Sequence, residues 1–146
     1  RHVMFTNGVS IILTGTNDDY KGMAIAWVSQ VEKDHLIVSI PKGAEATNLL
    51  LKRKMFSVNE LGIGQEELAR QFGGQNCEHK LTNSLAKLKS TEHNLPIILN
   101  CCSYTICNFL NVVEINEQLL ITAKIIGVQK NSDLQPLVFN KAVYFK

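Results

Sequence analysis

Long apolar runs, an excess of one charge and a Cys-x-x-Cys pair are all missing from this chain of 146 residues. The best apolar stretches, residues 9–13 and 95–99, are far shorter than a bilayer-spanning helix, so no membrane association is expected. A net charge of +2 falls short of the basic surface that binding to a phosphate backbone requires, which argues against a nucleic-acid partner. With 45% hydrophobic and 19% charged residues, the chain is not intrinsically disordered.

The usual nucleotide-binding and hydrolytic motifs are also missing. The sequence Gly62-Ile63-Gly64 lacks the third glycine of a dinucleotide fingerprint, and there is no Walker loop, His-Glu-x-x-His or Gly-x-Ser-x-Gly. The four histidines are scattered, so the sequence predicts no metal site and no catalytic residue. Any difficult chemistry would therefore be supplied by a cofactor.

The cysteines Cys77, Cys101, Cys102 and Cys107 form no Cys-x-x-Cys pair and match no zinc-binding spacing. We interpret them as free thiols that act as small hydrophobic residues in a reducing cytoplasm, and a redox-active thiol pair is the alternative. The chain begins Arg-His-Val without a basic and apolar leader, so we expect no targeting peptide.

Alternating apolar residues predict several strands with one buried face. The expected strands cover residues 9–13, 23–31, 36–41, 54–60, 109–115, 119–125 and 138–145, with a hairpin turn at 116–118. Helical spacing predicts helices at residues 44–54 and 65–72, the second ended by Gly73-Gly74, and a short helical turn at 83–89. The sum is a single domain, residues 1–146, that is mostly β with inserted helices. An antiparallel barrel fits this order better than alternating βαβ units.

The order and spacing of these segments resemble the flavin reductase-like family of FMN-binding split barrels. The motifs that carry the resemblance are Lys21-Gly-Met-Ala-Ile-Ala-Trp-Val-Ser-Gln-Val, Val38-Ser-Ile-Pro-Lys-Gly, Ala44-Glu-Ala-Thr-Asn-Leu-Leu-Leu and Gln65-Glu-Glu-Leu-Ala-Arg-Gln-Phe-Gly-Gly. The resemblance implies a six-stranded antiparallel Greek-key split barrel that forms a homodimer and holds FMN in a groove near the subunit interface. The tryptophan version of the first motif is similar to the flavoredoxin-like branch.

The resemblance also implies which residues contact the cofactor. The isoalloxazine ring would lie along Met23, Ala24, Ile25, Ala26 and Trp27, and the ribityl chain along Ser39, Ile40, Pro41 and Lys42. Thr47 would bond a phosphate oxygen, and Lys80 would approach the flavin. Independently, Lys42, the Thr47 hydroxyl and the free N–H groups of a helix starting near Ala44 would converge on one anion. The residues alone leave other interpretations open: polar residues around a helix start, a core or interface tryptophan, and a solvated lysine.

The predicted function is that of an FMN-dependent oxidoreductase, in which hydride passes from NAD(P)H to the flavin. Electrons would continue to free flavin, a redox partner protein or a flavin-using monooxygenase. A flavoredoxin-like electron carrier without its own NAD(P)H activity is the alternative, and a barrel that has lost its flavin is a third possibility. Many reductases of this family carry Gly-Asp-His where this chain has Asn116, Glu117 and Gln118, and Gln118 cannot carry a positive charge.

Overall fold

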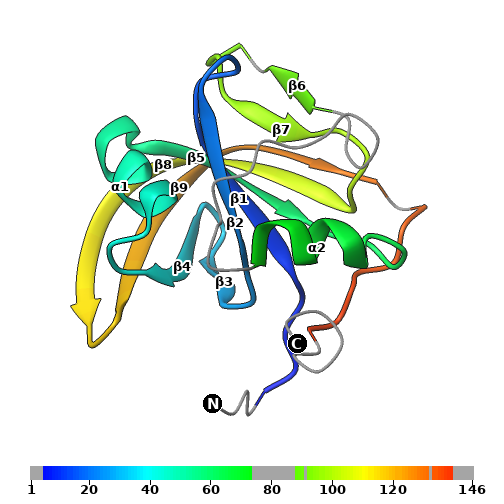
Figure 1. The fold of residues 1–146 in the computed structure, drawn as a ribbon, viewed down its shortest axis with the longest axis horizontal. Helices are drawn as coiled ribbons and strands as arrows, with labels where there is room; N and C mark the ends of the chain where they lie inside the picture. The colour runs from blue at the N-terminus through cyan, green and yellow to red at the C-terminus, as the bar shows by residue number, and fades with distance from the viewer. Residues whose placement is uncertain (1–4, 74–87, 91, 132, 140–146) are drawn as a thin grey trace.

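The computed structural model describes residues 5–73, 88–90, 92–131 and 133–139 (Figure 1). One antiparallel sheet holds seven strands in the order β2-β1-β5-β8-β9-β4-β3, and a separate pair of strands is formed by β6 and β7. In chain order the elements are β1 (Ser10–Gly15), β2 (Tyr20–Ile25), β3 (Val28–Glu32), β4 (His35–Pro41), α1 (Glu45–Arg53), β5 (Met55–Glu60), α2 (Glu66–Gly73), β6 (Leu88–Ser90), β7 (Pro96–Ile98), β8 (Ser103–Ile115) and β9 (Gln118–Lys130).

The two inserted helices form where the sequence predicts them. α1 begins with an acidic first turn at Glu45 and carries Lys52 and Arg53 in its last turn, which suits the helix dipole at both ends. It ends at Lys54, which adopts the left-handed conformation and donates its N–H to the carbonyl of Leu50. The prediction of a mostly β domain with two inserted helices is confirmed.

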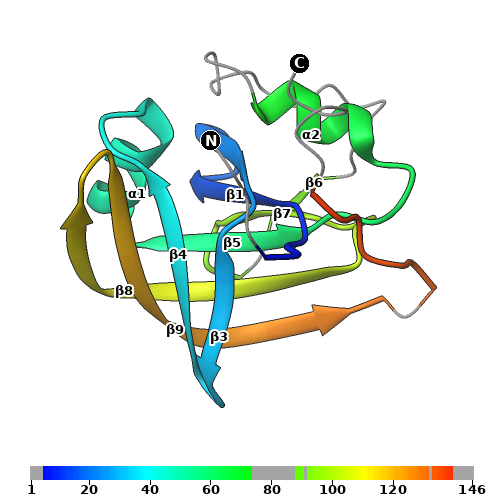
Figure 2. The same ribbon diagram turned by 90° about the horizontal axis from the view of Figure 1, so that it is seen from below.

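The predicted count of six strands is wrong, because the main sheet has seven. The expected strand at residues 23–31 is divided by Ala26 and Trp27 into β2 and β3, which form the two opposite edges of the sheet. Since only two residues join these edge strands, the sheet must curl until its edges meet at this corner. Figure 2 shows the resulting curvature, with β3 and β4 steeply inclined to β5 and β8.

The inner face of the curled sheet encloses a core of apolar side chains. Alternation places Leu36, Val38 and Ile40 of β4 inside, where they meet Leu119 and Ile121 of β9. α1 closes one end of this interior with Ala46 and Leu50. α2 packs on the opposite face of the sheet, where Leu68, Ala69 and Phe72 cover Ile11 and Leu13 of β1. The two helices therefore stabilise different faces of the same sheet.

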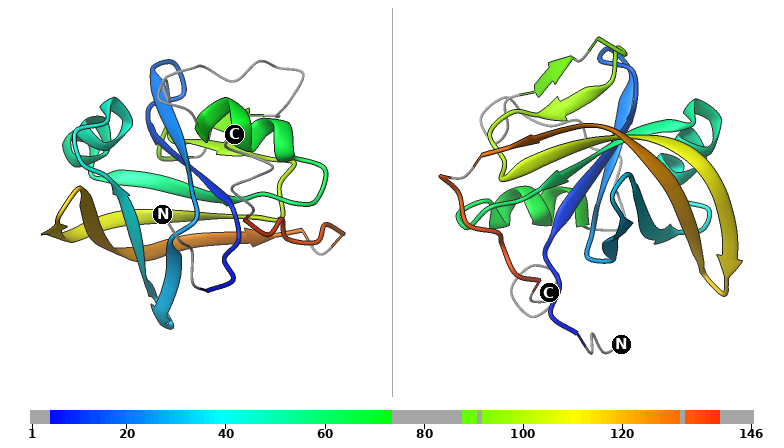
Figure 3. Two further views of the ribbon diagram at one scale, coloured as in Figure 1. Left: turned by 60° about the horizontal axis from the view of Figure 1, so that its bottom comes forward. Right: turned by 180° about the vertical axis from the view of Figure 1, so that it is seen from behind.

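β8 and β9 form a long hairpin that bends along its length (Figure 3). Two register shifts, between Ile106 and Cys107 and between Phe109 and Asn111, interrupt the pairing and account for the bend. Asn116 has a φ of 53°, a left-handed conformation that asparagine tolerates, and it makes the tight turn with Glu117. The predicted hairpin is confirmed, with Gln118 already the first residue of β9.

Two predicted segments fall partly outside the described residues. Of the expected helical turn at 83–89, residues 83–87 are not described, whereas residues 88 and 89 belong to β6, paired with β7. Of the expected strand at 138–145, Val138 pairs with Gly8 in an isolated bridge, and the residues from 140 onward are not described. Within the described ranges, none of the helices has the length and apolar content to cross a membrane.

Candidate functional site

A hollow of about 210 Å³ lies on the outer face of β3, β4 and β9. Because Val38 and Ile40 point into the core, their neighbours Ile37 and Ser39 face outward. Trp27 contributes from the corner between β2 and β3, and its carbonyl accepts a hydrogen bond of 3.0 Å from the Ser39 N–H. The lining residues are Asn7, Trp27, Val28, Ser29, Ile37, Ser39 and Leu120, so two of the predicted flavin-contacting residues meet in one groove.

Lys42 lies in the turn that leads from β4 into α1, and Lys21 of β2 lies close to the first turn of α1. Ala44 at the N-cap makes no side-chain cap hydrogen bond. Lys42 pairs with Glu114 at 2.5 Å, and Lys21 pairs with Glu45 at 3.1 Å. The hydrogen bond to Glu114 raises the pKa of the Lys42 ammonium, so this cation stays charged at every physiological pH.

Thr47 lies inside the protein rather than at its surface. Its hydroxyl donates a hydrogen bond of 2.7 Å to the Pro41 carbonyl and lies 3.8 Å from the sulfur of Met23. The side chain is fully buried, so the hydroxyl holds the turn that precedes α1 in place. A direct contact between Thr47 and a phosphate stays a prediction.

The side chains of the predicted ring-contacting segment, residues 23–27, point to different faces of the sheet. Met23 and Ile25, like Ile40 of β4, are buried in the inner core, which leaves only their main chain for contact with a ligand. Ala24 packs against the cluster beneath α2, and Ala26 faces a second hollow at the open end of the sheet. Trp27 is therefore the side chain of this segment that enters the groove. Lys80 lies outside the described residues.

Gln118 is joined to the groove by a hydrogen bond. The Ser39 hydroxyl donates to the Gln118 amide oxygen at 3.1 Å, although the two residues are 79 positions apart in sequence. β4 and β9 are paired in register, with Pro41 opposite Gln118 and Ser39 opposite Leu120. Gln118 thus lies beside a predicted flavin-contacting residue.

The structure adds groove residues that sequence reasoning missed. Asn7, Ile37 and Leu120 line the groove, and Glu114 holds Lys42. The outward position of Ile37 follows from the alternation of β4. The positions of Leu120 and Glu114 follow only from the register of the long hairpin, and the sequence does not determine that register.

The described cysteines are free and buried, which favours the interpretation as hydrophobic thiols. Burial raises the pKa of Cys101 and of Cys107 to about 12.

We expect neither the Cys101 thiol nor the Cys107 thiol to react with iodoacetamide near about pH 8 in the folded protein, because almost no thiolate is present at that pH. Stability should fall as the pH rises from 9 toward 12, because the unfolded thiols ionise first. Mass spectrometry of alkylated protein and urea unfolding at several pH values test these outcomes, and rapid alkylation of Cys101 or Cys107 would contradict them.

Among the residues that the structure describes, no three His, Cys, Asp or Glu side chains gather closely enough to hold an ion.

Comparison with known protein families identifies the chain. The family model described as "Flavin reductase like domain" matches residues 1–146. The chain belongs to the flavin reductase-like family. The resemblance to the flavin reductase-like family is thereby confirmed. No curated protein matches the chain in a sequence comparison.

Solved structures share the fold of this flavin reductase-like chain at low sequence identity. The NADH:FAD oxidoreductase from Streptomyces globisporus C-1027 is 19% identical with a TM-score of 0.81, over 93% of this chain and 82% of that one. An FMN-binding protein from Thermus thermophilus is 16% identical with a TM-score of 0.82, over 100% and 86%. The styrene monooxygenase flavin reductase from Pseudomonas putida S12 is 19% identical with a TM-score of 0.79, over 93% and 87%.

A similar structure from Sinorhizobium meliloti 1021 belongs to a longer protein. It has a TM-score of 0.83 and 16% identity and covers 97% of this chain, yet the chain spans only 49% of the length of that protein. At these identities the likeness is one of fold.

Proposed function

We propose that this protein is an FMN-dependent oxidoreductase that accepts hydride from NAD(P)H and passes electrons to free flavin or to a partner. The observation that carries the proposal is the groove at Trp27 and Ser39, because β4, which carries Ser39, leads directly into the uncapped start of α1. Membership of the flavin reductase-like family supports the cofactor class. Bound flavin would supply the redox chemistry by taking up hydride at its N5 atom.

The residues of the groove fit the parts of FMN by chemistry. The indole of Trp27 offers a planar apolar surface for a ring. The N–H groups at the start of α1, together with Lys42, offer donors and positive charge for a phosphate. Gly43 has a φ of 84°, and a Cβ atom added there would meet no atom within 4 Å, so this turn leaves room for an anion. In the split-barrel arrangement that we propose, the corner between β2 and β3 is where the ring lies.

A second candidate is a flavoredoxin-like electron carrier that another protein reduces. The hydrogen bond between Ser39 and Gln118 favours it, because Gln118 is neutral and its amide oxygen is already engaged. The family histidine at this place could carry a positive charge beside a nicotinamide, which Gln118 cannot do.

Anaerobic addition of NADH or NADPH to the FMN-loaded protein separates the two candidates. The oxidoreductase is expected to lose its flavin absorbance at a rate that saturates with nicotinamide concentration. A carrier would keep its absorbance with NAD(P)H and lose it with dithionite. Replacing Gln118 by His serves as the matched variant, and faster bleaching in Gln118→His would support the role assigned to this position.

We also propose a homodimer that forms across the face holding the groove. Val113 and Ile115 of β8 are each 53% exposed, and by register they lie beside Leu120 and Gln118 of β9. Such a patch of apolar side chains on adjacent strands is typical of an interface between protein chains. A second copy on this face would cover Ser39 and the mouth of the groove.

Replacing Val113 and Ile115 by Asp is expected to convert the dimer to a monomer, because burying two carboxylates would cost more than the interface gains. Sedimentation velocity at micromolar concentration measures the change. Leu99→Asp is the matched control, because Leu99 is 50% exposed but lies after β7, away from this face. A wild-type protein that sediments as a monomer would contradict the proposal.

The electron acceptor that we propose is free flavin used by a monooxygenase. The styrene monooxygenase flavin reductase among the similar structures supports this choice. The test is release of reduced flavin: a separate flavin-using monooxygenase, added across a dialysis membrane, should turn over only when FMN is present in solution.

A further inference from the structure

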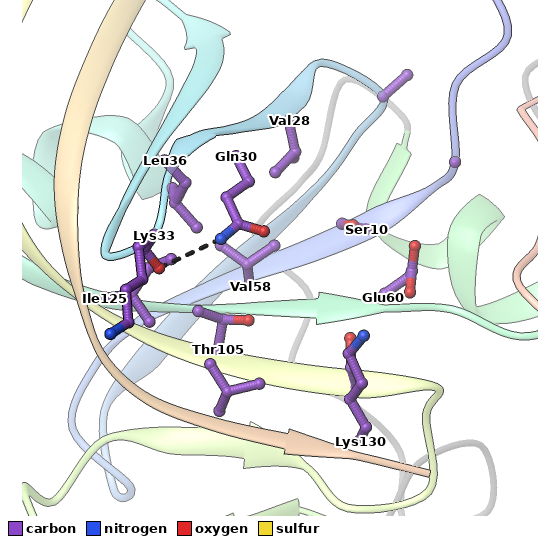
Figure 4. A pocket seen from close by; sticks show the side chains of 14 residues that line it. Ser10, Val28, Gln30, Lys33, Leu36, Val58, Glu60, Thr105, Ile125 and Lys130 are labelled. Carbon is purple, nitrogen blue, oxygen red and sulfur yellow. Dashed lines mark hydrogen bonds between the residues drawn. The ribbon is translucent and has the colours of Figure 1, made fainter. Parts of the chain in front are cut away.

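A second hollow, of about 440 Å³, opens on the inner face of the curled sheet, at the end opposite α1. Figure 4 shows Val28, Leu36 and Val58 around it, with Gln30 lying across it. Val28 lines both hollows, whereas Trp27 and Ser39 line only the groove on the outer face of the sheet. The inner hollow therefore opens on the other face of the sheet from the groove assigned to FMN, and Ala26 of the predicted ring-contacting segment lines it.

The register of the sheet arranges the walls of the inner hollow in rows. Ser10, Glu60, Ser103 and Lys130 lie opposite one another across β1, β5, β8 and β9 and form a polar row. Two residues deeper on the same face, Val58, Thr105 and Val128 form the next row. Beyond it, Phe56 and Cys107 belong to the inner core. The hollow thus has a charged rim and an apolar floor.

The two charged side chains of the polar row, Glu60 and Lys130, are not paired with each other. Among the described residues, neither the Glu60 carboxylate nor the Lys130 ammonium takes part in an ion pair, because the strand that carries Ser103 separates them. Two strand spacings amount to about 10 Å between their Cα atoms. The Gln30 amide nitrogen donates hydrogen bonds to the carbonyls of Glu32 and Lys33. The Gln30 amide oxygen is therefore the atom that can accept a hydrogen bond from a ligand. The hollow is therefore lined by acceptors and by two cations, Lys33 and Lys130.

We propose that the inner hollow binds a small zwitterion with an apolar side chain, of the class of the α-amino acids. Glu60, with the Gln30 amide oxygen, would accept the ammonium group, and Lys130 would pair with the carboxylate. The apolar side chain would lie on the floor formed by Leu36 and Val58. A ligand of this class satisfies the acceptors and the Lys130 cation together and buries apolar surface, whereas an anion alone would leave Glu60 facing a like charge.

Isothermal titration with three probes tests the charge pattern on the full chain. L-Phenylalanine is expected to bind at least about tenfold more tightly than 3-phenylpropionate, which lacks the ammonium, and than 2-phenylethylamine, which lacks the carboxylate. Glu60→Gln should remove the advantage over 3-phenylpropionate, and Lys130→Gln the advantage over 2-phenylethylamine. Lys124→Gln is the matched control, because Lys124 is exposed on the same strand and does not line the hollow.

Titration of the FMN-saturated protein tests whether L-phenylalanine binds in the inner hollow or in the groove. Binding in the inner hollow should give the same affinity for L-phenylalanine with and without FMN. Equal binding of all three probes, or preferences that survive Glu60→Gln and Lys130→Gln, would overturn the proposal. Loss of binding in the presence of FMN would place the ligand in the groove instead and overturn it as well. If L-phenylalanine does not bind at millimolar concentration, solvent or a second copy of the chain contacts Glu60 and Lys130 instead. This result would also overturn the proposal.

Discussion

Lys42→Glu is expected to weaken FMN binding about 100-fold, because a donor to the phosphate is lost and a like charge takes its place. Lys42 lies at the turn that leads into α1, where the free helix N–H groups also favour an anion. Its ion pair with Glu114 is half-exposed, so losing it should leave the stability of the fold almost unchanged. Titration of FMN monitored by fluorescence measures the affinity.

Glu114→Gln is the matched variant and should act in the opposite direction. It removes the carboxylate that pairs with Lys42 at 2.5 Å and leaves the ammonium free for a phosphate. We expect FMN to bind about threefold to tenfold more tightly, because the competing charge is gone. Unchanged affinity in both Lys42→Glu and Glu114→Gln would mean that the phosphate binds elsewhere.

Asn59→Ala is expected to lower the free energy of unfolding by about 3 kcal/mol, because three buried hydrogen bonds are lost at once. The Asn59 amide donates to the Ile11 carbonyl at 3.0 Å and to the Ser57 hydroxyl at 2.9 Å. Its oxygen accepts from the Ile98 N–H at 2.8 Å, and the side chain is fully buried. Asn59 therefore joins β1, β5 and β7, and its loss leaves an unpaired N–H in the core.

Urea unfolding measures the effect of Asn59→Ala as a lower midpoint with an unchanged dependence on denaturant. Asn48→Ala on the exposed side of α1 is the control and should change stability by less than about 0.5 kcal/mol. A shift of that small size in Asn59→Ala would show that water replaces the lost bonds.

Periodicity was sufficient to predict most of the elements but not the division at Ala26 and Trp27. Both helices and the long hairpin carry clear signals: helical spacing, acidic first turns and alternating apolar residues. Ala26 and Trp27 lack the Gly, Pro, Asn or Asp that mark turns, so nothing local shows that the chain changes strand there. The corner is set by the curvature of the whole sheet.

The site was less accessible to sequence reasoning than the fold. Trp27 and Ser39 meet in the groove as the family resemblance implied, although their contact with FMN stays a prediction. The resemblance implies that Thr47 bonds a phosphate oxygen, whereas in the structure its hydroxyl is buried against Pro41. Glu114 lies 72 positions from Lys42, and only the register of the hairpin brings the two together.

Fluorescence of the single tryptophan during FMN titration tests the central claim most directly, because Trp27 is the only tryptophan in the chain. A ring that stacks in the groove should quench Trp27 emission in a saturable manner, with one FMN bound per chain. Riboflavin, which lacks the phosphate, should quench to the same extent but bind at least about tenfold more weakly. Emission that FMN leaves unchanged, or equal affinity for FMN and riboflavin, would contradict a flavin held between Trp27 and the start of α1.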